Sequence, residues 1–160
     1  MPPVVGREPG VVGAAINSHA FTGIICDGIH VADEMVAMAI RARPISDRMY
    51  LISDAMPTVG GPTAFNLYGT KVSLINNCLV NSEGGLAGAH TTQRKSVKRL
   101  VDHIGVPTED ALKMAITTPG KVMGLQLDRL QGLSVKDIIC LTNSLEYSGT
   151  LADLLQLSEK

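Results

Sequence analysis

The sequence predicts an α/β fold in which strands and helices alternate along a parallel sheet. Residues 23–26 and 49–53 are short, mostly apolar runs of the kind that forms buried strands. Between them, residues 32–43 carry apolar side chains at helical spacing. A strand, a helix and a second strand in this order make the unit of a parallel sheet. With 160 residues, the chain is long enough for one domain with a hydrophobic core.

The segments up to the second strand have well-marked ends. Residues 1–10 are rich in proline and glycine and predict a loop, and residues 11–17 predict a short helix. The helix at 32–43 has acidic residues in its first turn and arginines in its last turn, which suits the helix dipole. Pro44 then ends it, because proline cannot continue a helix.

The rest of the chain predicts a small β region followed by helices. Asn76 and Asn77 tolerate a positive φ and indicate a hairpin turn. Thr108 is expected to cap the second of two helices, and Thr118-Pro119 to end it. The expected segments are strands at 64–67, 71–75, 79–80 and 137–142, a glycine-rich loop at 83–89, and helices at 91–103 and from 108.

The overall composition excludes several classes of function. The net charge is −1, so no basic surface is expected for nucleic acid or an anionic membrane. No run approaches the roughly 18 apolar residues of a membrane span. The N-terminus has no signal-peptide pattern, and the three cysteines are far apart in apolar runs. These features predict a cytoplasmic protein with reduced thiols.

Polar groups that could carry chemistry follow both predicted strands. Asp54 comes directly after the second strand, and Asp27 to His30 follow the first. Active sites of α/β proteins gather at the carboxyl ends of parallel strands, although an Asp or a His at such a position can equally serve only a turn. Arg7, on a proline- and glycine-rich loop, could bind a phosphate or simply face solvent. The loop at 86–89 could offer backbone N–H groups to a ligand or be an ordinary turn.

Metal ligands are not recognisable in this chain. The four histidines have no spacing typical of a metal site and no cysteine neighbours at ligand distance. The glycine-rich motifs that bind nucleotide phosphates and the GxSxG motif of serine hydrolases are also missing. The sequence therefore predicts no metal site within this chain.

Four segments together resemble one known family. GREPG, IICDGIHV, LISDAM and GGLAGAH occur in this order and at these intervals in the sequence. The combination resembles the N-acetylglucosamine-6-phosphate deacetylases of the amidohydrolase superfamily, which are metal-dependent (β/α)8 barrels. The resemblance runs from residue 1 to about residue 125 and more loosely to residue 150.

This resemblance implies a role for each candidate residue. Asp54 matches the catalytic aspartate, which acts as general base toward the metal-activated water and then as general acid to the leaving amine. Arg7 matches the arginine that binds the sugar phosphate, reaching across a homodimer into the neighbouring site. The implied substrate-binding wall consists of Asp27, Gly28, Ile29, His30, Leu86, Ala87 and Gly88.

The resemblance also implies an incomplete barrel. The chain matches the last two βα units of a (β/α)8 barrel with β-hairpin and helical C-terminal segments, whereas a closed barrel needs about 250 residues. We expect residues 1–125 to be the barrel portion and 126–160 to be a remnant of the small C-terminal β domain. The family's zinc or similar divalent metal is bound by residues upstream of the GREPG segment.

The expected reaction is deacetylation of N-acetylglucosamine 6-phosphate to glucosamine 6-phosphate and acetate, with little or no activity of this chain alone. Two alternatives remain open. One is a non-catalytic sugar-phosphate-binding or assembly subunit that needs a partner chain. The other is a piece of a different amidohydrolase.

Overall fold

A pair of parallel strands forms the centre of the molecule. The computed structural model describes residues 4–127 and 129–157. Strand β1 (Thr22–Ile25) pairs in parallel with β2 (Met49–Ile52), with Thr22 opposite Met49. Helix α2 (Asp33–Ala42) and the short 3-10 turn η1 (Ser46–Arg48) connect them. This confirms the predicted strand, helix and strand and their order.

Helix α2 buries one face against the strand pair. Val36 and Ala39 on this face are buried, while Asp33 and Glu34 lie in the first turn. Helix α1 (Gly10–Ile16) precedes β1 in the chain, contacts α2 and has no fully buried residue. Buried Arg43, just after α2, fixes α1 by donating hydrogen bonds to carbonyl oxygens near its C-terminal end. A single side chain therefore ties α1 to the end of α2.

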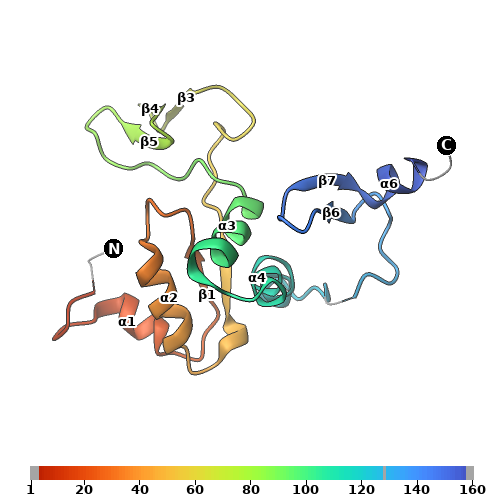
Figure 1. The fold of residues 1–160 in the computed structure, drawn as a ribbon. Coiled ribbons are helices and arrows are strands. Elements are labelled where there is room, and N and C mark those ends of the chain that lie inside the picture. Colours follow the sequence, from red (N-terminus) through yellow and green to blue (C-terminus); the bar gives the residue numbers. More distant parts are fainter. Residues whose placement is uncertain (1–3, 128, 158–160) are drawn as a thin grey trace.

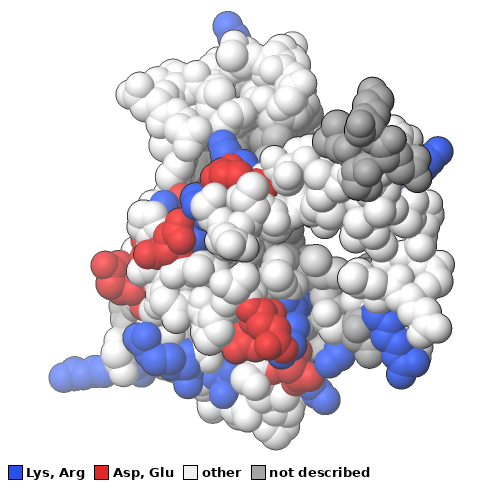
Figure 2. Space-filling view, turned by 45° about the vertical axis from the view of Figure 1, so that its right-hand side comes forward, with Lys and Arg blue, Asp and Glu red and all other residues white. Residues whose placement is uncertain are grey.

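A three-stranded antiparallel meander follows β2. It consists of β3 (Ala64–Leu67), β4 (Thr70–Ile75) and β5 (Cys78–Asn81). The predicted turn at Asn76-Asn77 is confirmed, since both residues have positive φ, at 49° and 65°. Figure 1 shows the meander apart from the helices. Figure 2 shows almost no charge on this part of the surface, and Lys71 is the one charged residue between residues 55 and 82.

A chain of short helical segments covers the strand pair. Its first helix is capped by Thr92, whose hydroxyl accepts the N–H of Lys95. Two predictions about the later helix are wrong. Thr108 begins the helix without capping it, and Pro119 lies in the first turn of a further helical segment, where proline needs no N–H partner. The segments are α3 (Gln93–Arg99), η2 (Leu100–Ile104, π-type), α4 (Thr108–Leu112), η3 (Lys113–Thr117, π-type) and α5 (Thr118–Val122).

The main core lies between the strand pair and these helices. Leu51 of β2 and Leu100 of η2 are almost fully buried there. The other buried members are Cys26, Val36, Ala39, Met49, Val97, Ala111, Met114 and Leu145. The opposite face of the strand pair is less covered: Ile52 remains 39% exposed. The core is therefore one-sided.

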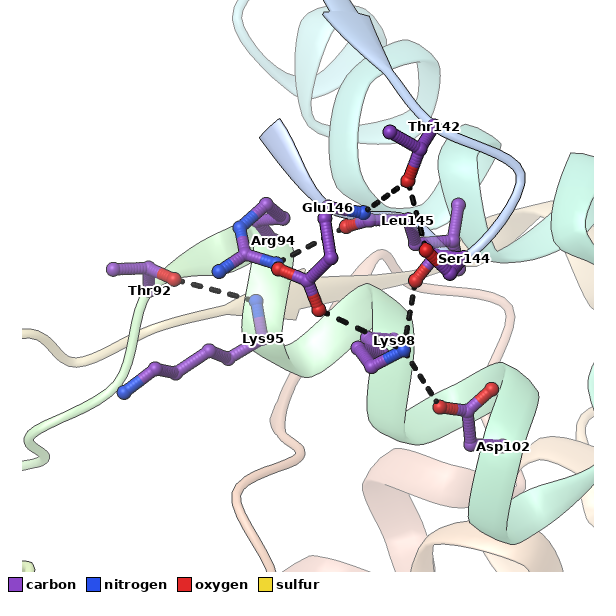
Figure 3. Close-up of polar contacts among 9 residues, drawn as sticks. All are labelled: Thr92, Arg94, Lys95, Lys98, Asp102, Thr142, Ser144, Leu145 and Glu146. Atoms are coloured by element: carbon purple, nitrogen blue, oxygen red, sulfur yellow. Dashed lines mark hydrogen bonds and ion pairs between the residues drawn. The ribbon is translucent and has the colours of Figure 1, made fainter. Parts of the chain in front are cut away.

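A C-terminal hairpin returns to this core. Strands β6 (Ile139–Leu141) and β7 (Tyr147–Thr150) pair antiparallel and lead into α6 (Leu151–Leu157). Leu145, in the turn between them, has a φ of 61° and packs into the main core. Figure 3 shows how Lys98 of α3 holds this turn, through a 2.7 Å bond to the Ser144 carbonyl oxygen. Arg94 likewise binds the Leu145 carbonyl oxygen and the Glu146 carboxylate.

Candidate functional site

Asp54 stands at the carboxyl end of β2 with a free side chain. It is exposed, and no hydrogen bond or ion pair of its carboxylate occurs among the residues that the structure describes. Its φ of 49° is left-handed, which is uncommon for a residue other than glycine. Such a conformation persists when the surroundings enforce it and is frequent at functional sites. The backbone here holds a carboxylate outward at the end of a strand.

The glycine-rich loop lies directly beside Asp54. The Ala89 N–H donates to the Asp54 carbonyl oxygen at 2.9 Å, and the Met56 N–H donates to the Ala89 carbonyl oxygen at 3.1 Å. Leu86 is exposed, while Ala87 and Gly88 are half-buried. The structure thus places the end of the glycine-rich loop beside the backbone of the predicted catalytic residue.

Asp27 forms a closed hydrogen-bonded turn with His30. Its Oδ1 accepts the N–H groups of Ile29 and His30, at 3.0 and 2.9 Å. Its Oδ2 lies 2.7 Å from Nδ1 of His30, and the Asp27 side chain is only 5% exposed. Burial tends to raise the pKa of this carboxyl, but the hydrogen bonds from Ile29 and His30 outweigh it and hold the pKa below its usual value. Asp27 is therefore an ionised anchor of the turn.

His30 keeps one ring nitrogen without a partner. Nδ1 is occupied by Asp27, whereas Nε2 is buried and has no hydrogen-bond partner among the described residues. Unpaired buried nitrogens are costly, and they call for a specific explanation. Nε2 is therefore the atom of this turn whose burial without a partner the described residues do not explain.

A partly buried ion pair packs against the same turn. Arg99 of α3 forms two bonds to the Asp33 carboxylate, at 2.7 and 2.8 Å. Its guanidinium occupies the space that a Cβ at Gly28 would need, and Gly28 has a φ of 72°. A pocket of about 220 Å³ lies between this turn and α3, and Cys26 is part of its wall. Burial, reinforced by the Asp33 carboxylate, raises the pKa of the Cys26 thiol to about 11, so the thiol is protonated at neutral pH.

Arg7 lies away from the other predicted residues. It is exposed in a tight turn closed by the Glu8 N–H and the Val5 carbonyl oxygen, at 3.1 Å. Figure 1 shows this turn beyond α1, at the outer edge of the molecule. In the described part of the chain, no hydrogen bond or ion pair joins Arg7 to Asp54.

The described residues do not fit a metal ion. A zinc site needs three or four nitrogen, oxygen or sulfur donors converging on one point. Across residues 4–127 and 129–157, no three His, Cys, Asp or Glu side chains are grouped in this way.

None of the helices in this part of the chain combines the length and apolar character that a bilayer span requires.

Three residues near the site were not predicted from the sequence. Arg99 backs Gly28, and Thr58 is joined to His90 at 2.9 Å, next to the glycine-rich loop. The sequence offered one signal for them: a histidine directly after the GGLAGA loop. Nothing in the sequence marked Thr58 or Arg99.

The comparisons with known proteins identify relatives in one class. No protein-family model matches the chain. An N-acetylglucosamine-6-phosphate deacetylase of Haemophilus influenzae is 27% identical over 154 residues, which cover 92% of this chain and 40% of that protein. A protein of Escherichia coli strain K12, provisionally named N-acetylgalactosamine-6-phosphate deacetylase, is 33% identical over 121 residues. That match covers 74% of this chain and 71% of the relative.

A solved structure gives the same result. The crystal structure of N-acetylglucosamine-6-phosphate deacetylase from Pasteurella multocida superposes with a TM-score of 0.80 at 31% identity. The match covers 93% of this chain and 40% of that chain. Such deacetylases have the TIM-barrel amidohydrolase fold and generally depend on a metal.

Fold and relatives first define the class, which is that of the amino-sugar-phosphate deacetylases. The chain belongs to the N-acetylglucosamine-6-phosphate deacetylase family. It spans about 40% of the length of the Haemophilus and Pasteurella proteins. The predicted family is thereby confirmed, whereas the assignment of β1 and β2 to the last two barrel strands stays a prediction.

Proposed function

We propose that this chain supplies the catalytic carboxylate and part of the substrate-binding wall for hydrolytic deacetylation of N-acetylglucosamine 6-phosphate. The observation that carries the proposal is Asp54, an exposed and unpaired carboxylate at the end of a rigid strand. The products would be glucosamine 6-phosphate and acetate. The family membership supports the reaction class, and the turn at Asp27 and the loop at 86–88 support the position of the substrate.

Asp54 would move the protons of this reaction. Hydrolysis joins the water oxygen to the acetyl carbon and breaks the bond from that carbon to the sugar nitrogen. The Asp54 carboxylate would accept a proton from the water and then deliver a proton to the departing nitrogen. Because its side chain has no competing partner among the described residues, both transfers are sterically open.

The substrate would lie between the two segments that flank this carboxylate. His30 would offer Nε2 to the sugar, while Gly28, Ile29 and the backbone at residues 86–88 would form the wall. Asp27 would hold His30 in position. Arg7 would bind the phosphate of a site in a second copy of the chain, because the turn that carries it lies beyond α1, at the outer edge of the molecule.

The metal that such deacetylases generally need would be held elsewhere. The described residues offer no ligand group, so we assign the ligands to other parts of the enzyme. We expect residues 1–125 to belong to the barrel portion and residues 126–160 to the C-terminal β portion. On this basis, the isolated chain should bind substrate without turning it over.

A binding and turnover experiment tests this proposal. N-acetylglucosamine 6-phosphate and unphosphorylated N-acetylglucosamine would be titrated into the chain and followed by NMR shifts of His30, Asp54 and Arg7. We expect binding of the phosphorylated sugar, weakened about tenfold or more by Arg7→Ala, since charge-assisted bonds to phosphate are strong. Arg41→Ala, which changes another exposed arginine, is the matched control.

Three outcomes would contradict the proposal. Equal binding of both sugars would remove the role of Arg7 and favour an amidohydrolase with a phosphate-free substrate. Absence of any shift at His30 and Asp54 would remove the site. Deacetylation by the isolated chain with added zinc, at a rate near that of an intact enzyme, would disprove the expected inactivity.

A further inference from the structure

Asp54 adopts a left-handed conformation, with a φ of 49°. Such values are uncommon for residues with a Cβ, although Asp adopts them more often than most, and Ala55, which follows, has no preference for a turn. The Asp54 side chain makes no hydrogen bond or ion pair among the described residues that would hold the conformation. We therefore look for its support in the backbone contacts around it.

Two backbone hydrogen bonds hold the two ends of the segment from Asp54 to Met56. Ala89 donates to the Asp54 carbonyl oxygen and accepts from the Met56 N–H, so one residue bridges both ends of the segment. Ala55 and Ala89 form an isolated parallel bridge. Ala89 is itself 1% exposed, so this bridge is protected from water.

A side-chain hydrogen bond joins the turn after Asp54 to the residue after the glycine-rich loop. The Thr58 hydroxyl lies 2.9 Å from Nδ1 of His90, and Thr58 is 3% exposed. Thr58 belongs to the turn that follows Asp54, and His90 follows the glycine-rich loop. This is the one side-chain hydrogen bond between these two segments in the described part of the chain.

A glycine allows the two segments to come this close. Gly88 has a φ of 79°, and a Cβ there would lie 2.5 and 2.6 Å from Cγ and Cε of Met56. A side chain at this position would therefore collide with the Met56 side chain, which would have to move. Gly88 therefore permits the close approach of the two segments because it has no side chain.

We infer that Thr58, His90 and Gly88 form a clamp that positions the catalytic carboxylate by enforcing the left-handed conformation of Asp54. Thr58 and His90 act as positioning residues and do not touch the substrate. The glycine-rich loop thereby gains a second role besides the substrate contact proposed above. The catalytic purpose of the clamp rests on the proposed function, whereas its effect on Asp54 does not.

The test removes the hydroxyl of Thr58 without changing its shape. In Thr58→Val, we expect the Met56 and Ala89 amides to exchange with solvent about 3- to 10-fold faster, the loss typical of one hydrogen bond. The three-bond coupling between the amide and α protons of Asp54, which depends on φ, should shift toward the value of extended backbone. Amides within the β1–β2 ladder should keep their exchange rates.

Matched variants separate the clamp from general destabilisation. Thr58→Ser keeps the hydroxyl and should behave as the unmodified chain. Thr118→Val changes another buried threonine, far along the chain in α5, and should leave Asp54 unchanged. If Thr58→Val does not fold, His90→Ala removes the same bond from its less buried side, and His90→Asn should restore it.

Two results would overturn the inference. One is an unchanged coupling constant of Asp54 in both Thr58→Val and His90→Ala. The other is an equal change in Thr118→Val, which would indicate a general loosening. Neither readout needs substrate or metal, so a failure of sugar binding would refute the proposed function and leave the clamp standing.

Discussion

The Asp27 carboxylate organises the turn that follows β1. It accepts two backbone N–H groups and faces the His30 ring, so all its contacts lie within the turn. A residue used in this way is unavailable to the substrate. Its resemblance-based assignment as a substrate contact stays untested, and the geometry favours a role in orienting His30.

The same contacts predict a pH dependence of stability. The folded-state pKa of Asp27 is lowered, so its stabilisation is present above the unfolded value of about 3.9 and is lost as the pH falls through the folded value. Asp27→Asn should cost about 1–2 kcal/mol at pH 7, because charge-assisted hydrogen bonds are lost. The cost should shrink as the pH falls below about 4, where the unfolded chain begins to bind a proton at Asp27, and it should be lost once the pH passes the lowered folded-state pKa.

Urea unfolding of both proteins at pH 7 and at pH 3 would measure this. Asp102→Asn is the control, because its exposed carboxylate pairs with Lys98 on the surface. A cost of Asp27→Asn that stays constant between the two pH values would contradict the assignment of an ionised Asp27.

At the scale of elements, the C-terminal hairpin depends on one apolar side chain more than on its ion pairs. Leu145 is buried in the main core, whereas Arg94, Lys98 and Glu146 are partly exposed. Burial of a leucine contributes far more than a surface ion pair. The salt bridges in Figure 3 therefore orient the turn, and Leu145 anchors it.

Two substitutions in this turn should differ strongly in their effect. Leu145→Ala should lower the free energy of unfolding by about 2–4 kcal/mol. Glu146→Gln should lower it by less than about 1 kcal/mol, with a smaller effect at high salt. Thermal unfolding at two salt concentrations would check both, and a larger loss for Glu146→Gln would contradict the order.

The helices and strands differ in how far the sequence foretold them. Strands β1 and β2 and helix α2 were predicted closely, because each is encoded by the local spacing of its own apolar residues. The π-type turns at Leu100–Ile104 and Lys113–Thr117 were not, since they keep the apolar spacing of an α-helix.

The site was predicted residue by residue but not as an arrangement. Polar groups at strand ends pointed to Asp54 and His30, because chemistry of this kind needs exposed polar atoms on a rigid support. The pairing of Ala89 with Asp54 could not be foreseen, because backbone bonds between distant segments leave no side-chain signature. Leu145 was missed for a related reason: a lone leucine in a polar turn has no periodicity.

At the scale of the whole molecule, the parallel sheet is unusually small. It has two strands, and an isolated pair is marginally stable without cover on its faces. Met49 and Leu51 face the helices, while Ile52 lies on the less covered face. In a closed barrel this face would point inward.

This open face predicts association of the isolated chain. We expect concentration-dependent self-association at micromolar concentrations, which sedimentation velocity would detect, because exposed apolar surface drives it. Ile52→Thr should weaken it. Ile75→Thr is the matched control in the meander, where the isoleucine is 54% exposed. A stronger effect of Ile75→Thr would contradict this prediction and would place the self-associating surface on the meander.

The contact between Gly28 and Arg99 restricts the order in which this site could change over generations. A side chain at residue 28 and the guanidinium at residue 99 claim the same space. A lineage could therefore acquire a side chain at residue 28 only if Arg99 moved or shortened, and either change would take the guanidinium away from Asp33. Two positions 71 residues apart in the sequence would thus share one history.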